Sequence, residues 1–342
     1  KFSTSLMPPE SQDILVKSTP DNNSCADTWK KAWMATPGPK TFGEHTYLFL
    51  KGLGMGTADI VPGVSGGTIA LITGIYEALL NAISSFSSRP FLQFLRLNFK
   101  QALSGIHLRF LTTLVFGIAF AIISTSHLIH FLLTEHPVQI WSVFFGLITA
   151  SILVLGHSIN NRFSSFPALI LGTIFAYGIT GLIPLNTPEE LWFIFLSGMI
   201  AISAMILPGL SGSFILLILG KYAFITAALR NPFNPDNLEI ILVFVAGCLV
   251  GVLGFSRILR YALERWHDYT LAVLTGIMLG SMPKVWPWKI TLESQIIRGN
   301  EHTLREENVW PLLDFELGIA LLLMVTGFLM VMMLDKISKQ QN

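Results

Sequence analysis

The sequence predicts an all-α polytopic membrane protein that is built as an inverted repeat. Composition points to the membrane, because the 342 residues are 52% hydrophobic and only 13% charged, whereas soluble domains contain about 25% charged residues. Long apolar stretches alternate with short polar joints from Phe42 onward. Two of these stretches contain the same motif: residues 62–68 read Pro-Gly-Val-Ser-Gly-Gly-Thr, and residues 208–214 read Pro-Gly-Leu-Ser-Gly-Ser-Phe. A duplicated helix break at membrane depth is typical of membrane proteins with two related halves.

Five segments are long and apolar enough to cross a bilayer, which takes about 20 residues of helix. A sixth segment, 269–282, is short and reaches this length only if Trp286 and Trp288 extend it to the interface. The polar, proline-containing residues 1–41 are expected to form a disordered tail, and residues 336–342 a cytoplasmic tail. The five segments are 110–133, 138–156, 166–184, 238–256 and 313–334.

Two further apolar regions, 46–87 and 190–230, each contain one copy of the Pro-Gly-x-Ser-Gly motif. When the chain is shifted by 146 residues, 13 of the 31 positions from 52 to 82 are identical, and the matches include proline, glycine, serine and tyrosine. Apolar composition alone would not match these residue types. Each region is therefore predicted to be a re-entrant broken helical hairpin followed by three transmembrane helices, with residues 42–184 as the first membrane repeat and residues 185–335 as the second.

The number of helices between the two hairpins predicts that the second repeat is inverted. If each hairpin enters and leaves on the same side, three spans separate them, and an odd number places the second hairpin on the opposite face. Residues 88–109 contain basic residues and no acid, which indicates a cytoplasmic segment. The same alternation places the C-terminus in the cytoplasm. If the hairpins instead cross the membrane fully, the chain has ten spans, and this orientation no longer follows.

The motif itself predicts an anion site. Proline and glycine end one helical arm, and the next arm begins near Ser65 or Ser211 with unbonded backbone N–H groups. The serine side chain can cap one N–H group, and the remaining donors and the helix dipole favour an anion such as phosphate. The alternative is a packing kink in which the serines bond their own backbone. The residues expected to hold a phosphate are Ser65, Gly66, Gly67, Thr68, Ser211, Gly212 and Ser213.

Charged residues near the motifs have two interpretations each. Arg257 is expected to assist phosphate binding, with Lys221 and Lys51 as further candidate cations, although each could instead reach toward the membrane interface. Asp59 and Glu77 are candidates for proton or sodium coupling, because an acid at membrane depth is costly and usually functional. Asp59 could instead pair with Lys51 or lie at an interface, and Glu77 could be interfacial.

Other classes of function are disfavoured. A net charge of +1 gives no electrostatic basis for binding nucleic acid. The histidines lack the spacing of metal ligands, so neither a metal nor a cofactor is expected. The sequence has no nucleophile cluster of the Pro-Ser-Gly-His type, so no catalytic residue is assigned and an enzyme such as a lipid phosphatase is not expected. An oligomeric state does not follow from the sequence.

Three longer motifs surround and follow the breaks. They are Gly52-x-Gly-Met-Gly-x-Ala-Asp-Ile-Val-Pro-Gly-Val-Ser-Gly-Gly-Thr68, Ala204-Met-Ile-Leu-Pro-Gly-Leu-Ser-Gly-Ser-Phe214 and Gly280-Ser-Met-Pro-Lys-Val-Trp-Pro-Trp288. Together they resemble the signatures of the bacterial polyprenyl-phosphate transporter family. The similarity covers residues 42–335, and Leu210 stands where isoleucine is usual.

This resemblance implies a protein that flips undecaprenyl phosphate, the lipid carrier of cell-wall building blocks, between the leaflets of the bacterial inner membrane. The implied partners are the lipid substrate and the surrounding membrane lipids, and a site that opens sideways would leave the isoprenoid chain in the bilayer. The residues by themselves indicate only an anion site in a membrane repeat. A transporter or channel for a small soluble anion is therefore the alternative.

Overall fold

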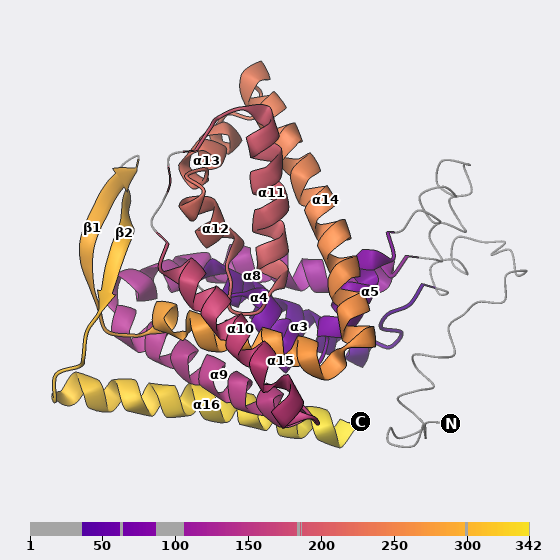
Figure 1. Cartoon of the computed structure of the whole chain (residues 1–342), viewed down its shortest axis with the longest axis vertical. Helices are drawn as coiled ribbons and strands as arrows, with labels where there is room; N and C mark the ends of the chain where they lie inside the picture. Colours follow the sequence, from indigo (N-terminus) through magenta and orange to yellow (C-terminus); the bar gives the residue numbers. More distant parts are fainter. Residues whose placement is uncertain are drawn as a thin grey trace, which may run out of the picture.

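The computed structural model of the chain describes residues 36–61, 64–86, 106–182, 185, 187–297 and 300–341 (Figure 1). Most of the predicted tail, most of the basic segment 88–109, and Pro62 and Gly63 of the first motif lie outside the described residues. The division of the chain into two membrane repeats stays a prediction, and the elements below are given in chain order.

Helices form most of the described structure. In the first half these are α3 (Phe42–Ile60), α4 (Gly66–Ile72), α5 (Tyr76–Ser84), α8 (Leu108–Glu135), α9 (Pro137–Ser158) and α10 (Arg162–Thr180). In the second half they are α11 (Leu191–Ile206), α12 (Gly212–Ile218), α13 (Tyr222–Arg230), α14 (Pro235–Arg265), α15 (His267–Ser281) and α16 (Phe315–Gln341).

Five helices in the described part of the chain are long and apolar enough to cross a membrane. These helices, α8, α9, α10, α14 and α16, coincide with the five spans predicted from the sequence. The number rises to seven if each of two bent helix pairs, α4 with α5 and α12 with α13, is counted as one span. Large apolar side chains are exposed along α8, α10, α14 and α16, as expected of surfaces that face lipid; they include Phe116, Phe120, Leu171, Ile174, Leu242, Leu249, Leu322 and Val325.

The prediction of an all-α fold is wrong after α15. There the chain forms a short 3-10 helix, η1 (Met282–Val285), followed by strands β1 (Lys289–Ile297) and β2 (Asn300–Asn308), which pair antiparallel. Trp286 and Trp288 therefore follow the helix rather than extend it, and α15 remains at 15 residues. Only the first five residues of β1, Lys-Ile-Thr-Leu-Glu, alternate between polar and apolar types as a half-buried strand does.

The duplication seen in the sequence is also present in the fold. Shifted by 146 residues, α4 and α5 coincide with α12 and α13 at both ends. α3 packs on α8, and α11 packs on α14. A Cβ atom at Gly117 would clash with the carbonyl of Phe49, and a Cβ atom at Gly247 would clash with the carbonyl of Phe195. A glycine on α8 and a glycine on α14 thus allow similar close contacts between helices in the two halves.

The two halves pack on each other through the last two helices of each half. α16 of the second half packs on α9 of the first, and α10 of the first half packs on α15 of the second. In Figure 1, α9 and α16 lie side by side along the lower edge, whereas α11 and α14 stand upright. Gly146 and Gly276 make these two contacts close, because a Cβ atom at either position would clash with a backbone carbonyl of the neighbouring helix.

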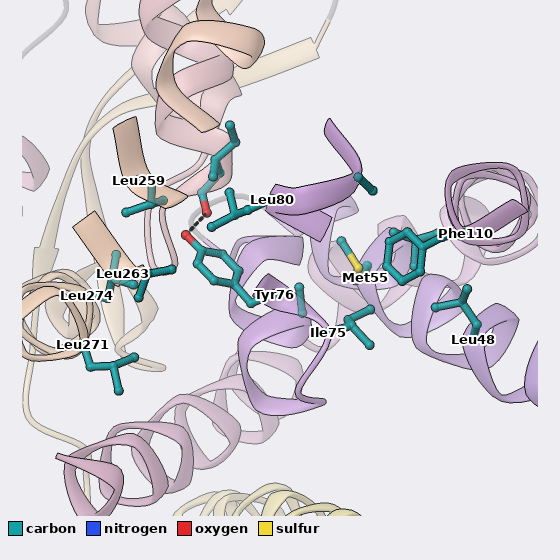
Figure 2. Close-up of a cluster of buried hydrophobic side chains, with 14 of the residues drawn as sticks. Leu48, Met55, Ile75, Tyr76, Leu80, Phe110, Leu259, Leu263, Leu271 and Leu274 are labelled. Carbon is teal, nitrogen blue, oxygen red and sulfur yellow. Dashed lines mark hydrogen bonds between the residues drawn. The ribbon is translucent and has the colours of Figure 1, made fainter. Parts of the chain in front are cut away.

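A buried apolar cluster joins the halves beside the first helix break. Figure 2 shows Tyr76 of α5 pointing toward Leu259 and Leu263 of α14 and Leu274 of α15, while Met55 lies on its other side. Tyr76 is 2% exposed. α5 is therefore held against α14 and α15 by the same core that surrounds the first broken helix.

Candidate functional site

The chain reverses direction at the first motif, as the sequence predicts. At the start of α4, the N–H of Gly66 donates to Asp59 Oδ1 at 2.7 Å, near the end of α3. At the end of α4, Lys51 Nζ donates to the carbonyl of Thr73 at 2.7 Å, near the middle of α3. These two contacts require α4 to run back along α3, so α3 and α4 form a helical hairpin.

The second motif makes the same reversal between α11 and α12. Leu207, Pro208, Gly209 and Leu210 form a turn that is closed by a bond of 3.4 Å from the N–H of Leu210 to the carbonyl of Leu207. Gly209 has a φ of +86°, which matches the third position of a type II turn with proline before it. A Cβ atom at Gly209 would also lie 2.6 Å from Ser281 Oγ.

Each hairpin contains a second bend that the sequence analysis did not predict. α5 is bent by 117° from α4, and α13 by 111° from α12. Gly74 and Gly220 stand at these bends with φ values of +71° and +64°. The amide of Ile75 bonds the carbonyl of Ala70 at 2.9 Å, as in a helix ended by a left-handed residue. The matching glycines at positions 74 and 220 were the sequence signal for these bends, because glycine with a positive φ terminates helices.

The two breaks lie against each other. The N–H of Gly209 donates to Thr68 Oγ1 at 3.1 Å, and Ser65 Oγ donates to the carbonyl of Met205 at 3.1 Å. Tyr76 Oη donates to the carbonyl of Ile206 at 3.0 Å (Figure 2). Residues separated by 130 or more positions in the sequence are thus joined at one place.

The first break is closed by its own side chains. Asp59 accepts the N–H of Gly66 at 2.7 Å, and Ser65 Oγ caps α4 by accepting the N–H of Gly67 at 3.1 Å. Ser65 and Thr68 are each 1% exposed, and the two glycines are buried as well. The donors and hydroxyls expected to hold a phosphate are therefore bound within the protein in this conformation.

The second break is more open. Ser211 makes no capping hydrogen bond, and its hydroxyl lies 2.8 Å from that of Ser213, which is exposed. Ser213 occupies the position of Gly67 in the first repeat, and Met205 the position of Asp59. Within the described chain, no acceptor bonds the N–H of Gly212 or Ser213. The second break thus retains donors that an anion can use.

The lysines predicted to assist phosphate binding lie at the opposite ends of the short helices. Besides its bond to Thr73, Lys51 lies 4.3 Å from the Tyr47 ring. Lys221 is 2% exposed and donates to the carbonyl of Thr187 at 2.9 Å. Since a helix rises 1.5 Å per residue, seven residues separate these ammonium groups from the breaks by about 10 Å.

Arg257 and Glu77 also lie away from the breaks. Arg257 is exposed on α14, and its guanidinium is 3.5 Å from the carbonyl of Phe86, beyond the end of α5. Glu77 is exposed, with Oε1 3.9 Å from Nδ1 of His267. The structure therefore gathers Ser65, Gly66, Gly67, Thr68 and Asp59 with the second motif, whereas the four remaining predicted side chains lie elsewhere.

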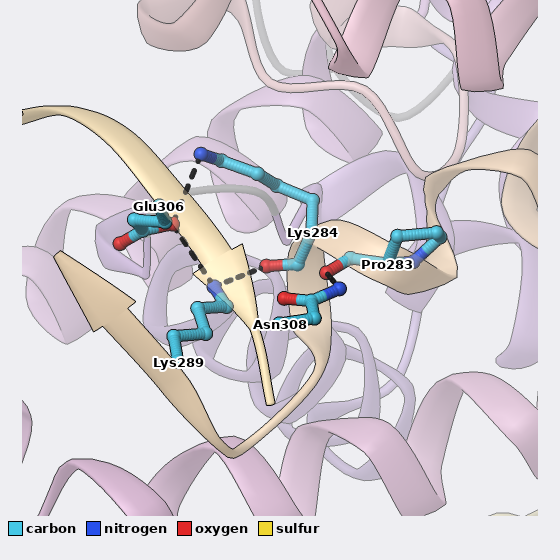
Figure 3. Close-up of polar contacts among 5 residues, drawn as sticks. All are labelled: Pro283, Lys284, Lys289, Glu306 and Asn308. Carbon is cyan, nitrogen blue, oxygen red and sulfur yellow. Dashed lines mark hydrogen bonds and ion pairs between the residues drawn. The ribbon is translucent and has the colours of Figure 1, made fainter. Parts of the chain in front are cut away.

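Two lysines that the sequence analysis did not assign lie beside the second break. Lys284 Nζ is 5.0 Å from the ring of Phe214 in the first turn of α12. It is also 3.2 Å from Glu306 Oε2, which is 3.3 Å from Lys289 Nζ (Figure 3). Burial lowers the pKa of Lys289 to about 8. The available signal was Lys284 itself, which is part of the Gly280–Trp288 motif.

Five spanning helices and two bent helix pairs, counted over the described residues, define a multi-pass membrane protein. In the same residues, no group of three or more His, Cys, Asp or Glu side chains could hold a metal ion. A family model described as undecaprenyl phosphate translocase-like matches residues 55–303. The chain belongs to this family, and the resemblance inferred from its motifs is confirmed at that level.

Two relatives cover most of the chain. One is the polyprenyl-phosphate transporter of Vibrio cholerae serotype O1 (strain ATCC 39315 / El Tor Inaba N16961), which is 44% identical over 311 residues, or 87% of this chain and 98% of that protein. The other is the polyprenyl-phosphate transporter of Staphylococcus aureus (strain NCTC 8325 / PS 47), which is 32% identical over 255 residues, or 70% of this chain and 85% of that protein. No solved structure matches the chain.

Proposed function

We propose that this protein flips undecaprenyl phosphate across the bacterial inner membrane by alternating access, with the phosphate held where the two helix breaks meet. The names of its relatives support a lipid that carries a phosphate as the substrate. The observation that carries the proposal is the contact between the breaks, in which Gly209 donates to the hydroxyl of Thr68. Both halves border this place, as alternating access between two related halves requires.

The proposed architecture is an inverted repeat of residues 42–184 and 185–335. The return of α4 along α3, and of α12 along α11, supports hairpins that enter and leave on one side. Three helices of spanning length, α8, α9 and α10, separate the two hairpins among the described residues, and an odd number inverts the second. On this topology the C-terminus lies in the cytoplasm.

We assign the phosphate to the second break in the conformation described here. Gly212 and Ser213 offer free donors beside the hydroxyl of Ser211, whereas the donors of the first break are bound to Asp59 and Ser65. The first break, with Gly67 and Thr68, would accept the phosphate only after these bonds open. Arg257, Lys51 and Lys221 remain proposed cations that would have to move toward the breaks.

Asp59 is the proposed coupling residue. Its carboxylate is the internal anion at the start of α4, and a proton or sodium ion that neutralised it would weaken its bond to Gly66. This would free a donor of the first break for the phosphate. Glu77 is exposed and next to His267, so we assign it the smaller part in coupling.

The test is leaflet exchange of undecaprenyl phosphate by the full chain in proteoliposomes, with and without an imposed pH gradient. We expect exchange that requires the protein and is not inhibited by excess inorganic phosphate, because the isoprenoid chain contributes to binding. Exchange that fails while inorganic phosphate crosses the membrane would instead assign the protein to the transport of small soluble anions.

A further inference from the structure

Lys284, Lys289 and Glu306 form a partly buried cluster with unbalanced positive charge (Figure 3). Both ammonium groups approach the same carboxylate oxygen, at 3.2 and 3.3 Å, and the side chains are 28%, 10% and 26% exposed. Two cations and one anion leave a net charge of +1. A charge withdrawn from water is costly unless a partner neutralises it. Binding of a further anion would therefore stabilise the cluster.

The cluster is held in a fixed geometry from both sides. Lys289 Nζ donates to the carbonyl of Lys284 at 2.7 Å and lies 4.3 Å from the ring of Trp141 on α9. At the base of the hairpin, Asn308 Nδ2 donates to the carbonyl of Pro283 at 2.9 Å (Figure 3), and Trp286 Nε1 donates to the carbonyl of Val309 at 2.9 Å. These bonds join the η1 segment to the start of β1 and to the end of β2. The ammonium groups therefore need little reorganisation to receive a ligand.

The cluster is adjacent to the open helix break. Lys284 Nζ lies over Phe214, the residue that follows Ser213. On the other side of the turn, Ser281, the last residue of α15, is packed against Gly209. An anion between Lys284 and the start of α12 would thus contact both the cluster and the second break.

We propose that Lys284 and Lys289 form a subsite for the phosphate monoester headgroup of the lipid, and that Glu306 is an internal anion which this headgroup displaces. The inference rests on the function proposed above. A phosphate monoester carries between one and two negative charges near pH 7, which matches the two ammonium groups once the carboxylate has turned away. On the proposed topology, a single crossing by α16 places the hairpin on the outer side, where the lipid carrier would be captured.

Charge-neutral variants separate this subsite from an ordinary structural ion pair. Lys284→Gln and Lys289→Gln should each weaken binding of undecaprenyl phosphate to the purified full chain about tenfold, because each removes a charge-assisted hydrogen bond. Glu306→Gln should instead tighten binding, because it removes the competing anion. Lys284→Arg should retain binding, and Lys336→Gln, at an exposed lysine of α16, should match the wild type.

The sign of the Glu306→Gln effect decides the question. If Glu306→Gln weakens binding as the lysine variants do, the carboxylate serves only to hold the lysines, and the proposal of a displaced anion is wrong. Unchanged binding in both lysine variants, with melting temperatures equal to the wild type, overturns the subsite itself. The subsite is also overturned if the lysine variants still bind undecaprenyl phosphate but no longer bind inorganic phosphate, because the lysines then bind only the free ion.

The same preparation distinguishes this inference from the proposed function. If wild-type proteoliposomes exchange undecaprenyl phosphate between leaflets but the three charge-neutral variants bind it as the wild type does, the subsite fails and the function stands. If the wild type exchanges no lipid between leaflets, yet the variants change binding of undecaprenyl phosphate as expected, the function fails and the subsite stands.

Discussion

The two Pro-Gly-x-Ser-Gly motifs are followed by short helices that begin at equivalent residues, Gly66 and Gly212, but they differ in what meets the first turn of each helix. In the first repeat, Asp59 and Ser65 accept the N–H groups of Gly66 and Gly67. In the second repeat, Met205 replaces the acid, and Ser213 replaces a glycine. Two substitutions in a duplicated scaffold thus change a closed, buried helix start into an open one.

This difference indicates how a symmetric scaffold can hold one ligand. If both helix starts were open, both would attract the phosphate and neither state would be favoured. An internal carboxylate at one of them lets the ligand and the protein compete for the same donors, so that a change at Asp59 shifts which break is available. The variants below test this comparison, starting with those expected to have the largest effect.

Gly209→Ala should be strongly destabilising. Its φ of +86° lies in the left-handed region, and the new Cβ atom would lie 2.6 Å from Ser281 Oγ and 3.0 Å from Met278 Cα. Backbone strain and overpacking together should cost about 2–4 kcal/mol of unfolding free energy. Thermal unfolding in detergent measures the loss. Gly254→Ala is the matched control, because its Cβ would meet nothing within 4 Å; equal stability of both variants would contradict the turn geometry.

Met205→Asp should close the second break in the way that the first is closed. The introduced carboxylate stands at the position equivalent to Asp59 and should accept the N–H of Gly212. We expect affinity for undecaprenyl phosphate to fall by about tenfold or more, since a fixed anion now competes with the ligand. Binding to the purified protein measures this, with Met205→Leu as control. Wild-type affinity in Met205→Asp would exclude the second break as the phosphate site.

Ser65→Ala should cost more stability than Ser211→Ala. The hydroxyl of Ser65 caps α4 and donates to the carbonyl of Met205 in the other repeat, so its loss should cost about 1–2 kcal/mol. The hydroxyl of Ser211 meets only that of Ser213 among the described residues, and its loss should cost about 0.5 kcal/mol. Chemical unfolding of both variants gives the comparison, and equal losses would mean that the two serines have equivalent roles.

Much of this arrangement was predictable from local sequence. The identities at an offset of 146 predicted the two hairpins, and proline with glycine predicted where α4 and α12 begin. The serines at positions 65 and 211 were correctly placed at the helix starts. These features follow from backbone conformation, which proline and glycine restrict or permit regardless of the surrounding fold.

Other features depend on side chains that are distant in sequence. Lys51 and Lys221 were assigned to the phosphate because they are near the motifs in sequence, yet the hairpin turns them toward the C-terminal ends of the short helices. The cluster at Glu306 depends on a β-hairpin that begins at Lys289, 75 residues beyond the end of the second motif at Phe214, and apolar periodicity gave no reason to bring it there. Pairing of this kind is set by tertiary packing, which propensity does not encode.

Asp59→Asn should have a small effect on stability and a specific effect on transport. The asparagine oxygen can still accept the N–H of Gly66, but the favourable interaction of a negative charge with the start of α4 is lost, which should cost about 0.3–1 kcal/mol. Because an amide binds no proton in this range, leaflet exchange in proteoliposomes should no longer respond to an imposed pH gradient. Glu77→Gln, at an exposed acid of α5, should retain the response. If Asp59→Asn retains it and Glu77→Gln loses it, Asp59 is a helix cap only, and the coupling belongs to the acid beside His267.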